Sequence, residues 1–171
     1  MQVLKGNNVM LRAMEPEDID ILYDWENDTT VWHISNTVTP FSRYMLEQYV
    51  FSSQDIYANK QVRLMIEANK IPIGCIDIFD FDPNNQKAGI GILITDEFRQ
   101  KGFASDALQT AIGYCFNILQ LHQLYCSILT DNEASLTLFT HNGFTVCGMR
   151  KEWVLINKEW KDEYFLQLLN A

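Results

Sequence analysis

The chain has 171 residues, of which 47% are hydrophobic and 20% charged, and 13 Lys and Arg against 22 Asp and Glu give a formal net charge of −9. This composition is typical of one globular domain and excludes a disordered chain. The acidic balance argues against a nucleic-acid-binding protein, which needs a basic face, and favours cationic small molecules or simply solubility. No apolar run reaches the ~18 residues that span a bilayer.

The N-terminus, the cysteines and the histidines carry no sign of export or of a metal. Residues 1–7 lack the basic and apolar regions of a signal peptide, so we expect a cytoplasmic protein. The three histidines are scattered without the spacing of metal ligands, so we expect no metal site. The four cysteines lie far apart in apolar runs, and we expect all of them to be reduced core residues: Cys75, Cys115, Cys126 and Cys147.

The first half of the chain reads as strand, helix, helix and hairpin. An alternating strand spans residues 8–13, and residues 15–18 supply the proline and acidic side chains of a helix start. A Thr-rich loop follows Asn27, and a second helical pattern begins near Ser42. Residues 61–67 and 73–79 then predict two strands joined by a turn.

The second half alternates strands and helices before it closes with two strands. A strand from about 87 to 95 feeds a turn at Gly102, and a helix runs from there to about Gln120. A buried strand at 124–129 and a helix that ends at Asn142 and Gly143 follow. With closing strands at about 144–156 and 161–169, we predict one α/β domain over residues 1–171 with a mixed sheet.

The turn after residue 95 is the most informative stretch. Gly102 has no Cβ, so the backbone there can approach a ligand closely. The amides of the turn and of the first helical residues have no intrahelical partner, and Arg99 and Lys101 add positive charge. These features suit a pyrophosphate, although the spacing is neither that of a P-loop nor that of a dinucleotide fingerprint.

A second motif lies between Asn132 and Phe144, with Ser135, Phe139 and Gly143 inside it. In this order and separation, the two motifs resemble those of the GCN5-related N-acetyltransferase (GNAT) superfamily. Residues 11–18 resemble the opening of the branch with ribosomal-protein and spermidine acetyltransferases, and the similarity covers nearly the whole chain. It implies the GNAT fold, an α+β domain whose mostly antiparallel sheet of six or seven strands is flanked by about four helices.

The resemblance also implies acetyl-CoA as the donor and assigns residues to it. Its pantetheine arm would pair with the strand edge at Ile92, Leu93 and Ile94, as an added strand does. Asn132 matches the family asparagine that binds the pantetheine and can also cap a helix. Ser135 is either a helper near the coenzyme or a small packing residue. The pyrophosphate would lie on the turn formed by Arg99, Gln100, Lys101, Gly102, Phe103, Ala104 and Ser105.

Two positions depart from the family's catalytic pattern. Many relatives have a general-acid tyrosine where this chain has Phe139, and often a glutamate base where it has Gly89. Water, Tyr125 or no acid at all remain as substitutes, because a thiolate is a tolerable leaving group. Asp77, and then Asp80 and Asp82, are the nearest acidic candidates for the base, although they also suit a solvated strand end.

The resemblance implies a primary amine as acceptor, with a polyamine such as spermidine foremost. Glu26 and Asp28 correspond to the acidic residues with which polyamine acetyltransferases hold their substrate, and Asp77 is a further candidate. Trp32 and Tyr44 are candidates for stacking on the cation or for the core. A protein N-terminus, an aminoglycoside and a non-catalytic acetyl-CoA sensor remain alternatives. The family also leads us to expect a homodimer or a higher homo-oligomer, and an exposed strand near the C-terminus could pair across subunits.

Overall fold

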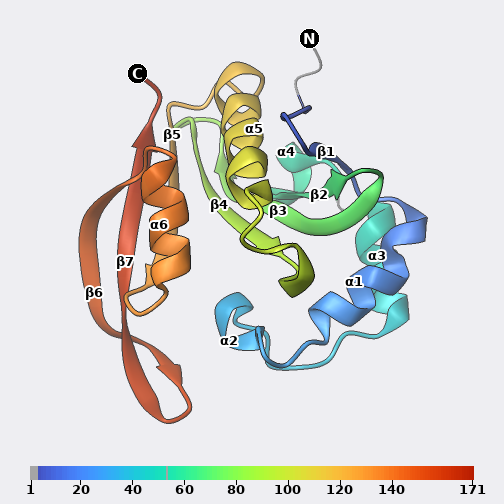
Figure 1. Cartoon of the computed structure of the whole chain (residues 1–171), viewed down its shortest axis with the longest axis horizontal. Helices are drawn as coiled ribbons and strands as arrows, with labels where there is room; N and C mark the ends of the chain where they lie inside the picture. The colour runs from blue at the N-terminus through green and yellow to red at the C-terminus, as the bar shows by residue number, and fades with distance from the viewer. Residues whose placement is uncertain (1–3, 53) are drawn as a thin grey trace.

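A computed structural model describes residues 4–52 and 54–171 (Figure 1). Within these residues, seven strands form one sheet in the order β1-β2-β3-β4-β5-β7-β6, and only β4 and β5 are parallel neighbours. This confirms the mixed, mostly antiparallel sheet of six or seven strands. The strands are β1 Met10–Ala13, β2 Val62–Ala68, β3 Ile71–Asp82, β4 Lys87–Ile94, β5 Gln123–Leu129, β6 Thr145–Ile156 and β7 Glu159–Leu169.

Six α-helices occur in the described residues, two more than the expected four. Four are α1 Ile19–Glu26, α3 Arg43–Ser52, α5 Phe103–Asn117 and α6 Glu133–His141. The other two, α2 Trp32–Ser35 and α4 Ile56–Asn59, are single turns, too short to give a helical period in the sequence. The helix α2 lies inside the segment expected to be a Thr-rich loop. Two short 3-10 turns, η1 Pro16–Asp18 and η2 Asp96–Phe98, precede α1 and the Gly102 turn.

The core lies on both faces of the sheet. Side chains alternate along a strand, so Leu64 and Ile66 join the cluster that includes Leu108 of α5. Met65, which lies between them, joins the cluster that includes Leu22 of α1. The helix α5 therefore covers one face, in front of the sheet in Figure 1, and α1 and α3 cover the other.

The strands β4 and β5 pair only at one end. Their register runs from Lys87 opposite Gln123 to Gly89 opposite Tyr125 and stops there. On its other side, β4 stays paired with β3 as far as Ile94. The sheet is therefore open between β4 and β5 along the rest of β4, next to α6.

A buried ion pair joins three elements near the start of the fold. The side chain of Asp18 is only 4% exposed and accepts hydrogen bonds from Arg12 Nη1 and Nη2 at 2.7 and 2.9 Å. It also accepts the backbone N–H of Glu15 at 2.8 Å, and Arg12 Nε pairs with Glu67 as well. One guanidinium thereby connects β1, η1 and β2.

Asp106 fastens the segment before β1 to the first turn of α5. Its Oδ1 accepts the backbone N–H of Asn7 at 2.9 Å. Its Oδ2 accepts those of Asn8 and Val9 at 2.7 and 3.1 Å. A Cβ at Gly6 would lie 2.7 Å from both Asp106 Oδ1 and Thr110 Oγ1, so a larger residue there would displace these side chains.

The edge strand β6 is exposed along most of its length. Cys147 lies on it with an exposed side chain, so the expectation of four core cysteines is wrong for this one. The residues around Cys147 are apolar, but they belong to an edge strand that no other described element covers. Elsewhere, no helix in residues 4–52 and 54–171 is long and apolar enough to cross a bilayer. The same residues contain no cluster of three His, Cys, Asp or Glu placed to hold a metal ion.

Candidate functional site

Two cavities meet at the middle of β4. One, which we call the Arg63 cavity, has a volume of about 520 Å³ and lies between the α1–α2 segment and strands β2 to β4. The other, the strand cleft, has a volume of about 390 Å³ and lies between β4, β5 and α6. They share Ile34 and Asn36 from the α2 region, Phe79 of β3, and Gly91 and Ile92 of β4. Molecules bound in the two cavities would therefore meet at Gly91.

The turn beyond β4 has the geometry of an anion cradle. Gly102 has a φ of +83°, in the left-handed region that other residues rarely adopt, and a Cβ there would have nothing within 4 Å. Gly102 is also the N-cap of α5, which is 15 residues long and has no side-chain cap. The first amides of a long helix are thus available to an anion, with the positive end of the helix dipole behind them.

The two basic residues of this turn already have neighbours. Arg99 donates from Nε to the carbonyl of Ile94 at 2.9 Å and pairs through Nη1 with Asp96 at 2.8 Å. The Nζ of Lys101 lies 5.4 Å from the centre of the Phe98 ring. Arg99 therefore anchors the turn on the end of β4, and its charge remains beside the cradle.

The free edge of β4 offers backbone groups to the strand cleft. The N–H of Thr95 donates to the carbonyl of Ile73 on β3 at 2.9 Å. Because backbone groups alternate in direction along a strand, those of Ile92 and Ile94 face the β5 side, where the pairing has ended. Leu93 differs, since its backbone faces β3 and its side chain lines the Arg63 cavity. An extended chain in the cleft would find the N–H and C=O of Ile92 and the N–H of Ile94.

Three residues of α6 and its cap line the other wall of the cleft. The Oδ1 of Asn132 caps the helix by accepting the N–H of Ser135 at 3.2 Å. Its Nδ2 donates no hydrogen bond within residues 4–52 and 54–171, so this donor is available to a ligand. Phe139 is 4% exposed and packs edge-on against Phe144, with ring centres 5.0 Å apart. It supplies an apolar wall and no proton.

Tyr125 lines the strand cleft, but its hydroxyl is engaged elsewhere. It donates to Asp80 Oδ2 at 3.1 Å. Partial burial, the charge of Asp80 and this hydrogen bond together raise the pKa of Tyr125 to about 12. The phenol therefore stays protonated at neutral pH and keeps its hydrogen bond to the carboxylate of Asp80.

The ring of Phe79 packs over Gly89. Phe79 and Gly89 are directly opposite each other on β3 and β4. A Cβ at Gly89 would lie 2.3 Å from Cε2 of Phe79, far inside van der Waals contact. The aromatic ring thus occupies the space that a glutamate at this position would need.

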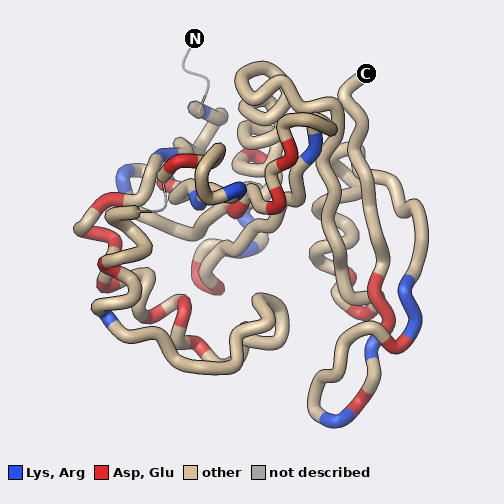
Figure 2. The backbone as a smooth tube through the Cα atoms, turned by 180° about the vertical axis from the view of Figure 1, so that it is seen from behind, with Lys and Arg blue, Asp and Glu red and all other residues tan. Residues whose placement is uncertain are grey.

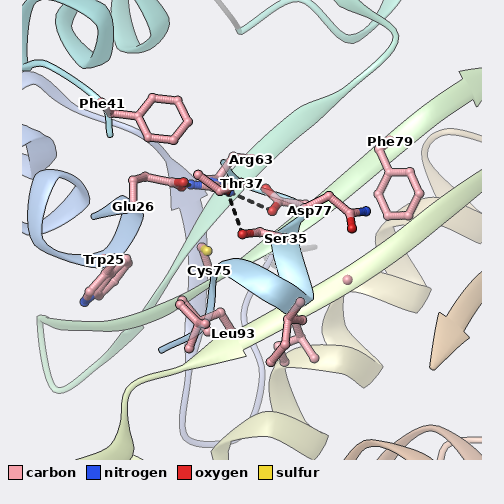
Figure 3. Close-up of a pocket in the computed structure, with 15 residues that line it drawn as sticks. Trp25, Glu26, Ser35, Thr37, Phe41, Arg63, Cys75, Asp77, Phe79 and Leu93 are labelled. Atoms are coloured by element: carbon pink, nitrogen blue, oxygen red, sulfur yellow. Dashed lines mark hydrogen bonds and ion pairs between the residues drawn. The ribbon is translucent and has the colours of Figure 1, made fainter. Parts of the chain in front are cut away.

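Arg63 of β2 is the central charged residue of its cavity (Figure 3). Its Nε and Nη2 donate to the two oxygens of Asp77 at 2.7 and 2.8 Å, and its Nη1 pairs with Glu26 Oε1. Burial alone would lower the pKa of Arg63, but Cys75, Asp77 and Glu26 raise it well above its ordinary value. The cavity therefore holds a permanent cation between two carboxylates, with the thiol of Cys75 beside them.

Among the described residues, the remaining candidates do not line either cavity. Asp28 accepts hydrogen bonds from the N–H and Oγ1 of Thr30 at 2.9 and 2.6 Å. Trp32 donates from Nε1 to the carbonyl of Glu26 at 2.8 Å and so braces the cavity from outside. Tyr44 is 68% exposed on α3. Asp82 closes the turn after β3 through Asn85.

Sequence reasoning missed the residues that shape the Arg63 cavity most. Arg63 itself pairs across strands with Asp77, which was a candidate. The aromatic walls come from Trp25 and Phe41, and not from Trp32 or Tyr44. The available signal was the opposite charge of Arg63 and Asp77 in two strands already predicted to form a hairpin.

Residues 8–145 match the family described as acetyltransferase (GNAT) domain. The spermidine N(1)-acetyltransferase of Vibrio cholerae is 25% identical over 97% of this chain and 95% of that protein. The Escherichia coli K12 enzyme of the same name is 24% identical over 92% of this chain and 83% of its own length. The crystal structure of the Vibrio cholerae spermidine N-acetyltransferase in complex with CoA and spermine has a TM-score of 0.86 at 25% identity and 96% coverage of both chains. The chain belongs to the acetyltransferase (GNAT) domain family and is an N-acetyltransferase with acetyl-CoA as its donor.

Proposed function

We propose that residues 1–171 form one N-acetyltransferase domain that transfers the acetyl group of acetyl-CoA to a primary amine of a polyamine such as spermidine. The observation that carries the proposal is the meeting of the strand cleft and the Arg63 cavity at Gly91 and Ile92. A thioester at the end of an extended arm in the cleft and an amine in the Arg63 cavity would react there. The spermidine acetyltransferases among the relatives support a polyamine as the acceptor.

The coenzyme part of the proposal rests on backbone groups. The pyrophosphate binds the amides of Phe103, Ala104 and Ser105 beyond Gly102, with the charges of Arg99 and Lys101 nearby. The pantetheine arm extends along β4 as an added strand. Asn132 donates from Nδ2 to this arm while its Oδ1 caps α6.

The charge around the Arg63 cavity supports a cationic acceptor. Residues 13–42 contain seven Asp and Glu and no Lys or Arg. Figure 2 shows these acidic positions along α1 and its flanking segments. Arg12, Arg43 and Arg63 pair with three of them, Asp18, Asp20 and Glu26. The excess of negative charge therefore comes from the other four carboxylates, and it raises the local concentration of cations near the site.

The reaction joins the amine nitrogen to the thioester carbonyl carbon, while the carbon–sulfur bond breaks and the thiolate leaves. The attacking amine must be neutral, although an alkylammonium has a pKa near ~10.4 in water. Both oxygens of Asp77 accept hydrogen bonds from Arg63, so we assign Asp77 to holding a cation rather than to removing a proton. The ammonium loses one proton to water before the attack, and the nitrogen loses a second proton to water as the amide forms. The thiolate leaves without an acid and takes a proton from water afterwards, because Phe139 has none to give.

Thiol release from acetyl-CoA tests the function. We expect purified protein to accelerate it with spermidine and to give a product heavier by one acetyl group. An aminoglycoside and a short peptide should be slower by at least about tenfold, since neither presents a flexible polycation to the acidic rim. The value of kcat/KM for spermidine should rise about tenfold per pH unit from pH 7 to 9, because deprotonation of the amine limits the rate.

The outcomes of this assay separate the candidate acceptors. Faster turnover of the peptide or the aminoglycoside would replace the polyamine with that class of acceptor. If a protein that still binds acetyl-CoA turned over no amine, this result would contradict the proposed reaction. A rate that is flat between pH 7 and 9 would point to a side-chain base.

We also propose that two copies of the chain associate through β6, in a cytoplasmic protein. The strand is an edge of 12 residues and exposes Val146, Met149, Trp153 and Leu155 by about half each. Exposed apolar edges of this length normally have a partner. We expect light scattering to give twice the 19.9 kDa mass of one chain. Val146→Lys should shift this mass toward that of one chain, and a monomeric wild-type protein would contradict the proposal.

A further inference from the structure

We propose that Arg63 determines the substrate specificity of its cavity by reducing the net charge there from −2 to −1. The inference rests on the proposed function and names the charge class of the acceptor. With one net negative charge, the cavity holds one ammonium group of a polyamine beside the reacting, neutral nitrogen. Further cationic nitrogens of a longer amine stay outside it.

The geometry leaves room for this ammonium without displacing Arg63. Each oxygen of Asp77 accepts one hydrogen bond from Arg63, and a carboxylate has about four acceptor positions. Glu26 contributes only Oε1 to Arg63. The side chain of Asp77 is 38% exposed and faces the cavity, as Figure 3 shows. Asp77 and Glu26 can therefore each accept a further hydrogen bond from a bound cation.

The apolar walls of the cavity strengthen the interaction between its charges and a bound cation. Trp25, Phe41 and Phe79 supply an apolar lining in which charges interact more strongly than in water. Arg63 is 15% exposed and keeps its charge at any working pH, since its pKa lies well above the ordinary value. The positive charge of Arg63 is therefore a fixed part of the site.

A purely structural role for Arg63 makes a different prediction. If Arg63 only joined β2 to β3 and α1, its loss would weaken every ligand alike and lower the stability of the fold. A specificity role instead changes the ratio between ligands of different charge. The informative quantity is therefore the ratio of affinities for spermine and n-butylamine.

The test is calorimetric titration of the whole chain, without acetyl-CoA, with n-butylamine, 1,4-diaminobutane, spermidine and spermine. We expect R63Q to raise the spermine to n-butylamine affinity ratio by about tenfold, as one added negative charge does for a partly buried site. E26Q should lower the ratio by a similar factor. The double variant R63Q/E26Q, which restores the charge of −1, should lie within about twofold of the wild type.

Two further variants separate charge from structure. R63K keeps the charge but not the two-point contact with Asp77, so we expect lower stability with an unchanged ratio. R43Q removes the same charge at the exposed Arg43–Asp20 pair outside the cavity, and it should leave the ratio unchanged. An R43Q effect as large as that of R63Q would assign the specificity to overall charge.

An unchanged ratio in R63Q and E26Q would overturn the proposal. If R63Q does not fold, E26Q and R63K still decide the question, because each keeps a cation opposite Asp77. Binding is measured without the donor. A protein that ranks amines by charge yet transfers no acetyl group would therefore contradict the proposed function but not the role of Arg63.

Discussion

Replacing Gly102 with Glu should strongly weaken the binding of acetyl-CoA while the protein still folds. The Cβ would point into open space, so the cost to the fold is the left-handed backbone, about 1–2 kcal/mol. The new carboxylate would lie at the uncapped N-terminus of α5, where we place the pyrophosphate. Repulsion between two such charges at about 4–5 Å amounts to roughly 3 kcal/mol, so the KM for acetyl-CoA should rise by more than about a hundredfold.

Two alanine variants separate charge from strain in this result. G102A has the backbone strain without the charge, and we expect less than about a tenfold change in the KM for acetyl-CoA. G143A imposes a similar backbone strain at the end of α6, where φ is +93°, and places its Cβ 3.2 Å from Leu168 Cδ1; it should leave this KM unchanged. A Gly102→Glu protein that kept the wild-type KM would show that the phosphate binds elsewhere.

Asp18→Asn should destabilise the fold strongly. The buried carboxylate accepts three hydrogen bonds, two of them from Arg12. The amide keeps the shape but removes the charge, and Glu67 is then the one carboxylate in the described part of the chain that pairs with Arg12, whose Nη1 also donates to the carbonyl of Ala13. Breaking such a pair from one side costs about 3 kcal/mol, to be measured by urea denaturation at pH 7. Asp20→Asn, in an exposed pair with Arg43, is the matched control and should cost little.

The pH dependence of this effect has a definite sign. Burial of Asp18 opposes its ionisation, but the hydrogen bonds from Arg12 and Glu15 outweigh burial and lower the pKa of Asp18 below its ordinary value. The stabilisation is therefore complete above the unfolded-state pKa of about 3.9 and is lost as the pH falls through the lower, folded-state value. The difference between wild type and Asp18→Asn should shrink in strongly acidic buffer, and a constant difference would argue against this pair as its source.

The sequence predicted the elements that are long enough to show a periodic pattern. It missed those whose position depends on tertiary contacts. The strands, the four longer helices and the glycine turn at residue 102 follow from local patterns. The single turns α2 and α4 do not, although Asp55 caps α4 by accepting the N–H of Tyr57. The exposure of Cys147 was also invisible, because local hydrophobicity does not reveal which strand forms the edge of a sheet.

The Arg63 cavity illustrates why a site is harder to predict than a fold. Near the hairpin turn, Ala68 lies opposite Ile71, and continuing that register would place Arg63 opposite Ile76. A bulge between Ile66 and Glu67 shifts the register by one residue, so that Arg63 meets Asp77. One extra residue in β3 thus determines which side chains share a face. No local pattern announces such a bulge.

The contact of Asp106 with residues 7–9 makes the beginning of the chain and the start of α5 one cooperative unit. Three backbone N–H groups donate hydrogen bonds to this carboxylate, which lies within the first helical turn beyond Gly102. A bulky extension that pulls residues 7–9 away would leave the carboxylate bare, and its charge would then oppose phosphate at the same helix end. We therefore expect a bulky extension at the start of this chain to weaken the binding of acetyl-CoA, although residues 7–9 line neither cavity.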